Sequence, residues 1–241
     1  MELREDSFYR FSEDGDLIRL KNELILEMPL DILIGGRHLT TVMFTPSMIR
    51  ETVIGLLFCK GYIQRVTDIE RLDIEEDQNL FKAHVSIKNN VRIGKNCNIF
   101  RIIEDKCKFS LSIIVKVPHI IKKFQPLYMR TEAAHAGILL DKDGKNIICA
   151  EDIGRHNTLD KVIGYCLLNQ IPFKDKILVS TGRANLDSVS KAIKAGIAVF
   201  VCISRPSAMA VDMARRYNMT LVDVGRGSYR IYSVPERIIL D

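Results

Sequence analysis

The sequence predicts an α/β protein with a small β-rich N-terminal region, residues 1–110, and a larger α/β domain, residues 111–241. Strand-like apolar runs dominate the first region, and strand and helix patterns alternate regularly after residue 111. Residues 197–203 form an all-apolar run typical of a central strand in a covered sheet. These three observations together indicate a layered sheet.

The N-terminal region is mostly of strand pattern, as in residues 23–34 and 81–87. One helix is predicted after Pro46, and it ends at Gly61, a residue type that favours helix C-termini. Its apolar residues repeat at helical spacing and predict one buried face: Ile49, Val53, Leu56 and Leu57.

The second region is predicted to continue from a hairpin into repeated strand and helix units. The Asp143-Gly144 turn favours a hairpin between residues 137–140 and 146–149. The following helix has apolar positions at i, i+3, i+4, i+7 and i+8: Leu159, Val162, Ile163, Cys166 and Leu167. The later elements are expected to be a strand at 176–180, a helix at 186–195, a strand at 197–203, a helix after Pro206 and a strand at 220–222.

The composition is that of a globular protein, with 47% hydrophobic and 27% charged residues. No apolar run approaches the roughly 18 residues needed to cross a bilayer, and the acidic N-terminal residues lack a secretory signal, so a cytoplasmic protein without a membrane partner is expected. The net charge of +5 suits an anionic partner but is too mild to indicate nucleic-acid binding. The Cys and His spacings do not predict a metal site.

Polar residues gather where predicted strands end and helices begin, the place where open α/β sheets bind ligands. The three clusters are residues 151–157, 180–185 and 204–207. Hydroxyl groups, glycine, arginine and a helix N-terminus recur among them, and this set suits phosphate or another anion. The candidate binding residues in the first two clusters are Asp152, Gly154, Arg155, His156, Asn157, Ser180, Gly182 and Arg183.

The alternative for each cluster is helix capping with a local ion pair. Asn157 would be the N-cap of a helix with Asp160 in capping-box position, and Asp152 would pair with Arg155. For a single cluster the two interpretations are equally supported. Three clusters in register favour ligand binding.

Two further candidates lie outside these clusters. The segment Val224-Gly225-Arg226-Gly227-Ser228-Tyr229 has glycines that would let a ligand approach the backbone beside arginine, although alone it would be taken for a hairpin turn. His135 begins an apolar run, so a hydrogen-bonded core histidine and a ligand contact are both open. Position 137 is glycine and no P-C-x-x-C motif follows, so zinc-deaminase chemistry is not supported.

Cys97 is the candidate reactive thiol. It lies in a polar segment near Arg92, Lys95 and Arg101, whose positive charge would favour the thiolate. The alternative is an ordinary loop cysteine, because no base is identified nearby.

Several long motifs, in order, resemble the FdhD/NarQ family of formate dehydrogenase accessory proteins. The motifs are MFTPSMIRETVIGLLFCKGYI, TEAAHAGILLDKDG, EDIGRHNTLDKVIGYCL, STGRANLDSVSKAIKAGI, SRPSAMAVDMA and LVDVGRGSYRIYSVPERI. The likeness spans most of the chain, and it implies a cytidine-deaminase-like α/β domain without the deaminase zinc.

The resemblance also implies a function as a sulfur carrier. Such a protein accepts persulfide sulfur from a cysteine desulfurase and passes it to the molybdenum of a guanine-dinucleotide molybdenum cofactor, before that cofactor enters formate dehydrogenase. By position, residues 224–229 match the family's cofactor-binding segment, and Cys97 matches the first cysteine of its C-G-x-C loop. GDP or GTP would then mimic the cofactor, and a homodimer is a further expectation.

Two positions depart from the family pattern. Phe100 stands where the second loop cysteine is expected, and Glu132 replaces the first glycine of the T-G-G-x-H-A-A segment. Cys107 could resolve a persulfide in place of the missing cysteine. The alternative function is a cofactor chaperone or guanine-nucleotide binding protein that has lost sulfur transfer, and a third is an interaction protein whose polar clusters are only caps.

Overall fold

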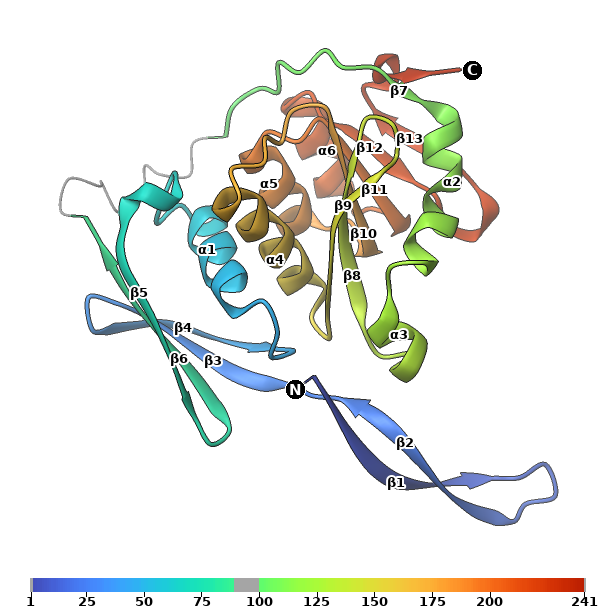
Figure 1. Ribbon diagram of the computed structural model, residues 1–241. Helices are drawn as coiled ribbons and strands as arrows, with labels where there is room; N and C mark the ends of the chain where they lie inside the picture. The colour runs from blue at the N-terminus through green and yellow to red at the C-terminus, as the bar shows by residue number, and fades with distance from the viewer. Residues whose placement is uncertain (1, 89–99, 241) are drawn as a thin grey trace.

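The computed structural model describes residues 2–88 and 100–240, with the side chain of Arg226 excepted. The chain begins with a two-stranded antiparallel arm, β1 (Leu3–Phe11) and β2 (Leu17–Ile25), which extends away from the rest of the molecule (Figure 1). The sequence pattern at 23–34 was predicted as one strand, but it divides between β2 and the next strand, because the two halves pair with different neighbours.

A four-stranded sheet follows, in the order β4-β3-β6-β5. Its strands are β3 (Met28–Ile34), β4 (Arg37–Phe44), β5 (Ile69–Asp77) and β6 (Leu80–Ile87). Helix α1 (Ile49–Lys60) packs its predicted apolar face on this sheet and ends at Gly61 as expected. The sheet and helix share one hydrophobic cluster, centred on Leu30, Ile32, Phe44 and Leu57.

The second part is a six-stranded mixed sheet in the order β13-β12-β11-β10-β8-β9. Its strands are β8 (His135–Asp141), β9 (Asn146–Asp152), β10 (Lys176–Arg183), β11 (Val199–Ser204), β12 (Thr220–Asp223) and β13 (Arg230–Ser233). Strands β10, β11 and β12 run parallel, while β8 is antiparallel to β10. The predicted α/β fold class is therefore confirmed.

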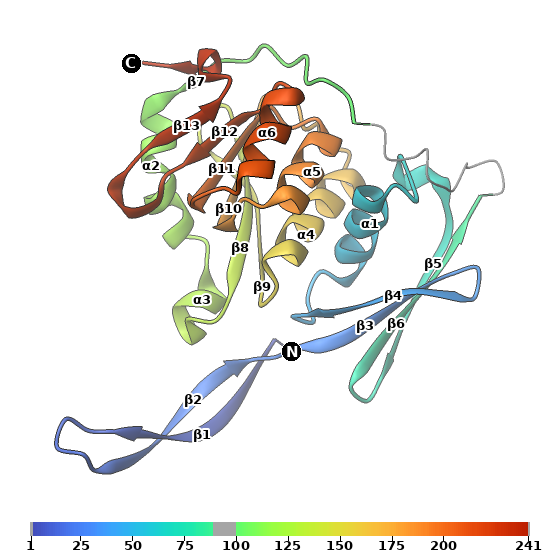
Figure 2. The same ribbon diagram turned by 180° about the vertical axis from the view of Figure 1, so that it is seen from behind.

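Helices cover both faces of this sheet (Figures 1 and 2). Helices α4 (Arg155–Leu168), α5 (Leu186–Ala195) and α6 (Ala208–Arg216) pack on one face, and α2 (Leu111–Lys122) packs on the other. The short helix α3 (Pro126–Thr131) leads into β8, and β7 (Phe109–Ser110) pairs in parallel with β14 (Ile238–Ile239). Among the described residues, no helix combines the length and apolar character needed to cross a membrane.

Two glycines allow a close contact between helix α1 of the first part and helix α4 of the second part. A Cβ atom on Gly55 of α1 would lie 1.9 Å from the carbonyl oxygen of Asp160, and one on Gly164 of α4 would lie 1.9 Å from that of Glu51. The helices therefore cross with backbone against backbone, a distance that only glycine permits. This crossing brings the turn between β4 and α1 next to the turn between β9 and α4.

Candidate functional site

The predicted polar clusters meet at one edge of the six-stranded sheet, called the loop edge below. The parallel strands β10, β11 and β12 all end there, at Arg183, Ser204 and Asp223. The antiparallel strand β8 starts at the same edge with His135, which is the register partner of Asp152 at the end of β9. The structure thus brings residues 151–157, 180–185, 204–207 and 224–229 together.

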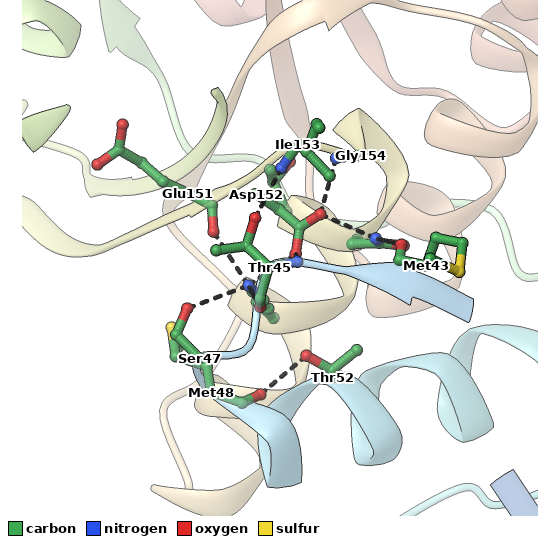
Figure 3. A network of polar contacts seen from close by, with 12 residues as sticks. Met43, Thr45, Ser47, Met48, Thr52, Glu151, Asp152, Ile153 and Gly154 are labelled. Carbon is green, nitrogen blue, oxygen red and sulfur yellow. Dashed lines mark hydrogen bonds and ion pairs between the residues drawn. The ribbon is translucent and has the colours of Figure 1, made fainter. Parts of the chain in front are cut away.

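A buried network fixes the first loop of this edge (Figure 3). The Lys161 ammonium lies 2.7 Å from the Asp152 carboxylate, and both side chains are 0% exposed. The other Asp152 contacts are with backbone and amide donors: Thr45 N at 3.0 Å, Gly154 N at 2.7 Å and Asn157 Nδ2 at 2.9 Å. Asp152 therefore holds its own loop to the turn before α1.

Lys161 of helix α4 belongs to the same network. Its Nζ donates to the carbonyl oxygens of Thr45 and Glu151, both at 3.0 Å, and to Ser47 Oγ at 3.3 Å. Burial lowers the pKa of Lys161, and the nearby Asp152 carboxylate opposes that effect. A buried pair with this many partners has little freedom to rearrange. Thr45 also accepts a hydrogen bond from Ile153 N at 3.1 Å.

The capping interpretation of this loop was wrong in its details. Helix α4 begins at Arg155 with Gly154 as N-cap, and no side chain caps it. Asn157 instead lies inside the helix and donates to Met43 O at 2.7 Å as well as to Asp152. Asp160, predicted in capping-box position, accepts from Lys191 at 2.6 Å. These residues reach across to other elements, contacts that a local sequence motif does not reveal.

Arg155 projects across the neighbouring loop. A Cβ atom on Gly182 would lie 2.9 Å from Arg155 Cδ, so the arginine stem passes directly over this glycine. The Arg155 Nε atom is buried and has no hydrogen-bond partner among the described residues. Buried donors are usually paired, so the unpartnered Nε atom of Arg155 is an exception among the described residues.

Two histidines flank Arg155. His135 Nδ1 lies 3.4 Å from Thr181 Oγ1, and burial, followed by the charge of Arg155, lowers the pKa of His135. His156 Nε2 lies 2.9 Å from Asn185 Nδ2, and burial lowers the pKa of His156, although Asp187 opposes the shift. Both lowered pKa values favour neutral rings at pH 7. Because Asn185 Oδ1 already accepts from Ser188 N, its amide nitrogen donates and His156 Nε2 accepts.

Two exposed arginines add positive charge to the loop edge. Arg183 follows Gly182 at the end of β10, and Arg205 follows Ser204 at the end of β11. Neither guanidinium has a side-chain or backbone partner among the described residues. Ser180, in contrast, is 2% exposed and accepts from Gly182 N at 3.2 Å, so its hydroxyl shapes the loop.

The segment 224–229 covers the end of β11. Val224 N donates to Cys202 O at 2.9 Å, and a Cβ atom on Gly225 would lie 1.9 Å from Ile203 O, so glycine is required there. Gly227 has φ +69, a left-handed conformation that also favours glycine. Tyr229 is 44% exposed, and Ser228 N donates to Gly225 O at 3.1 Å.

The sequence model of the FdhD/NarQ family matches residues 25–239. The chain belongs to the FdhD/NarQ family. Among its relatives is the sulfur carrier protein FdhD of Sulfolobus acidocaldarius, 32% identical over 245 residues that cover 95% of this chain and 96% of the relative. The sulfur carrier protein FdhD of Bacillus subtilis is 30% identical and covers 94% of each chain.

A solved structure is similar over the full length of this FdhD/NarQ member. It is a crystal structure of a protein from Desulfotalea psychrophila assigned as a formate dehydrogenase accessory protein. The TM-score is 0.85 with 25% sequence identity, and the match covers 99% of this chain and 100% of that one. The arrangement of helices and strands is thus shared with that protein.

The family-derived thiol cannot be placed against the loop edge, because Cys97 lies outside the described residues. The described chain resumes at Phe100, whose ring packs 5.5 Å from that of Tyr217. Cys107, considered as a resolving thiol, donates to Lys108 O at 3.6 Å, and burial together with Asp175 raises its pKa. A raised pKa disfavours the thiolate that exchange requires.

Sequence reasoning missed Thr45 and Lys161 as parts of the site. Lys161 lies between core residues of α4, and a lysine in the buried stretch of a helix was the available signal. Thr45 is 107 residues from its partner Asp152, and the sequence had no signal for that pairing. Within the described ranges, no group of three or more His, Cys, Asp or Glu side chains could hold a metal ion.

Proposed function

We propose that this FdhD/NarQ member is a cytoplasmic sulfur carrier that serves formate dehydrogenase. It accepts persulfide sulfur from a cysteine desulfurase and delivers it to the molybdenum of a guanine-dinucleotide cofactor. The proposal draws on family membership and on relatives that carry the name sulfur carrier protein FdhD. The cofactor is cargo here, bound during delivery and then released.

The observation that carries the proposal is the set of arginines at the loop edge. Arg155 has a buried Nε atom without a partner, and Arg183 is exposed and unpaired among the described residues. The pyrophosphate of a guanine dinucleotide offers several anionic oxygens, which planar guanidinium groups bind well. The half-buried, neutral His135 and His156 beside them would accept or donate hydrogen bonds without adding charge.

The first experiment tests the cradle with GDP as a mimic of the cofactor. Isothermal titration calorimetry is expected to show that GDP binds the wild type. The Kd for GDP should be at least about tenfold higher for Arg155→Ala and for Arg183→Ala, because a charge-assisted contact contributes about 1.5–3 kcal/mol. Arg37→Ala, which changes an exposed arginine at the start of β4, is the matched control. Equal affinity in all four proteins would reject the cradle.

The second experiment tests the thiol. In the transfer, the Cys97 thiolate attacks the outer sulfur of the desulfurase persulfide, and the desulfurase cysteine leaves as a thiolate. Incubation with a desulfurase and sulfur-labelled cysteine should load the wild type and Cys107→Ala, but not Cys97→Ala. Equal loading of Cys97→Ala would remove this residue from the mechanism.

The packing of Phe100 supports a second candidate, a cofactor chaperone without sulfur transfer. Its ring lies against Tyr217 and the buried side chains of the six-stranded sheet, so position 100 serves packing in this chain. The two candidates differ in one outcome. GDP binding without sulfur loading of the wild type would favour the chaperone, and GDP binding with Cys97-dependent loading would favour the carrier.

A further inference from the structure

The side chain of Asn185 has a fixed orientation at the start of helix α5. Its Oδ1 atom accepts from Ser188 N at 3.0 Å and from Ser188 Oγ at 2.8 Å, and it caps the helix. A backbone N–H group can only donate, so the atom that faces it must be the amide oxygen. The amide nitrogen therefore points the other way, toward His156 of helix α4, and α4 lies beside α5 (Figures 1 and 2).

The contact between these two side chains determines which nitrogen of the imidazole ring carries the proton. Asn185 Nδ2 lies 2.9 Å from His156 Nε2, and because the amide nitrogen donates, Nε2 must present its lone pair. A neutral ring carries one proton, so that proton is on Nδ1. A second proton, on Nε2, would place two donors opposite each other. The Asn185 contact therefore favours a neutral His156 with an Nδ1–H group.

The charges around His156 agree with a neutral ring. The Asp187 carboxylate lies 4.0 Å from Nε2 and would draw a proton there, but it is exposed, and Lys191 Nζ lies 3.6 Å from it. Burial lowers the pKa of His156, Asp187 opposes that shift, and the cations Lys191 and Arg155 add to it. Lys191 also donates to His156 O at 3.2 Å, so α5 holds the backbone of this residue as well as its ring.

The Nδ1–H group is the remaining donor of the His156 ring. Among the described residues, Nδ1 has no hydrogen-bond partner, and the His156 side chain is 38% exposed. The preceding residue, Arg155, has the buried Nε atom without a partner, so two donors that lack protein acceptors are adjacent in the chain at the loop edge. A neutral N–H group beside a guanidinium suits an anionic oxygen as acceptor.

We propose that Asn185 is a positioning residue that holds His156 as a neutral Nδ1–H donor, and that this donor binds a phosphate oxygen of the guanine nucleotide. The identity of the ligand rests on the proposed function, whereas the position of the ring proton does not. Nε2 is committed to α5, so Nδ1 alone serves the ligand. His156 then adds a directional hydrogen bond beside the charged Arg155 and Arg183, without adding charge itself.

The first test reverses the donor that faces Nε2. Asn185→Asp keeps a cap on α5, since aspartate and asparagine cap helices about equally well, but it replaces the amide nitrogen by an acceptor oxygen. The ring ¹⁵N chemical shifts of His156, identified as the signals lost in His156→Gln, report which nitrogen carries the proton. At about pH 8.5, above the ordinary histidine pKa of about 6.5, the wild type should carry the proton on Nδ1 and Asn185→Asp should carry it on Nε2.

The second test measures the Kd for GDP at the same pH by calorimetry. Asn185→Asp should raise this Kd about tenfold or more relative to the matched control Leu186→Asp, because the Nδ1 lone pair would then face a phosphate oxygen. Leu186 is exposed and directly follows the cap, so its change to aspartate adds the same charge and leaves Asn185 in place. His156→Asn, whose amide can present an N–H group near the Nδ1 position, should retain more of the affinity than His156→Ala.

The contrary outcomes are distinct, and circular dichroism checks that each variant is folded. A wild-type ring proton on Nε2, or a proton that stays on Nδ1 in Asn185→Asp, would overturn the role of Asn185. Equal GDP affinity in Asn185→Asp and Leu186→Asp would overturn the contact between Nδ1–H and the nucleotide. A wild type that does not bind GDP would reject the nucleotide cradle and this contact together, while the ¹⁵N spectrum would still decide the position of the ring proton.

Discussion

Asp152 accepts from four donors contributed by three separate parts of the chain: the Thr45 backbone, the Lys161 ammonium, the Gly154 backbone and the Asn157 amide. A carboxylate surrounded in this way is held in one position. Because it follows β9 directly, it also sets where the loop carrying Arg155 begins. Its contribution is therefore to stability and to the position of the loop that carries Arg155.

Removal of this carboxylate should destabilise the protein strongly. Asp152→Ala leaves the Lys161 ammonium buried without its counter-ion, which is expected to reduce the free energy of unfolding by about 3–5 kcal/mol. Urea denaturation measures the change. Asp143→Ala, whose pair with Lys142 lies on the surface, should change it by less than about 1 kcal/mol. A similarly small effect of Asp152→Ala would contradict the network.

The two histidines predict a pH dependence of stability. Burial lowers the pKa values of His135 and His156 below the ordinary 6.5. As the pH falls below 6.5, the unfolded state binds protons that the folded state does not, so the free energy of unfolding decreases until the folded-state pKa values are passed. Denaturation across this window should show a smaller decrease for His135→Gln with His156→Gln. The exposed His119→Gln is the control and should follow the wild type.

Two glycines of the loop edge should give different phenotypes. At Gly182 an added Cβ meets the flexible Arg155 stem, and at Gly225 it meets the backbone oxygen of Ile203. Gly182→Ala should therefore displace Arg155 and weaken GDP binding several-fold with little loss of melting temperature. Gly225→Ala should lower the melting temperature. Calorimetry measures the GDP affinity, and thermal unfolding measures the melting temperature. If Gly182→Ala lowered the melting temperature and Gly225→Ala weakened GDP binding instead, Gly182 would not be what positions Arg155.

The spacing of apolar residues predicted most helices and strands of the second region correctly. The hairpin of β8 and β9, the helices α4, α5 and α6 and the strands β10 to β12 all lie where the pattern predicted them. No element was predicted for α2, because its run of β-branched residues with Pro118 fits neither period clearly. The division between β2 and β3 was missed because the alternation of apolar and polar residues does not indicate which strand pairs with which.

The crossing of α1 and α4 should be sensitive to a single methyl group. Gly55→Ala places Cβ against the backbone of Asp160, and the two helices must separate. A loss of about 1–3 kcal/mol or more in the free energy of unfolding is expected from this overpacking. Lys60→Ala, an exposed change in the same helix, should have little effect. Unfolding curves that coincide for both variants would disprove the close crossing.

At the scale of the whole molecule, the sequence predicted which loops form the site better than what each residue does there. The rule that strand ends meet at one edge placed residues 151–157, 180–185 and 204–207 together correctly. The roles of Asp152 and Asn157 as buried anchors depend on Thr45 and Met43, more than 100 residues away. Only the folded chain reveals such contacts, and ligand contact by these two side chains stays a prediction.

The arm is expected to be separable from the rest of the fold. A chain that starts at Leu26 retains both hydrophobic clusters, since neither contains a residue of β1 or β2. Its melting temperature and its GDP affinity, measured by thermal unfolding and by calorimetry, should stay close to those of the wild type. A truncated chain that fails to fold would show that the arm supports the body directly.

The glycine crossing of α1 and α4 has a consequence for how this protein can be recombined. The position of the loop edge depends on the turn near Thr45, which hydrogen-bonds to the loop after β9. This turn lies in the half of the chain that carries none of the predicted binding residues. A chimera that joins the first half of one family member to the second half of another would keep both cores. Such a chimera would position Arg155 correctly only under two conditions. Each half must keep its glycine at the helix crossing, and the first half must keep the turn that contacts Asp152 and Lys161.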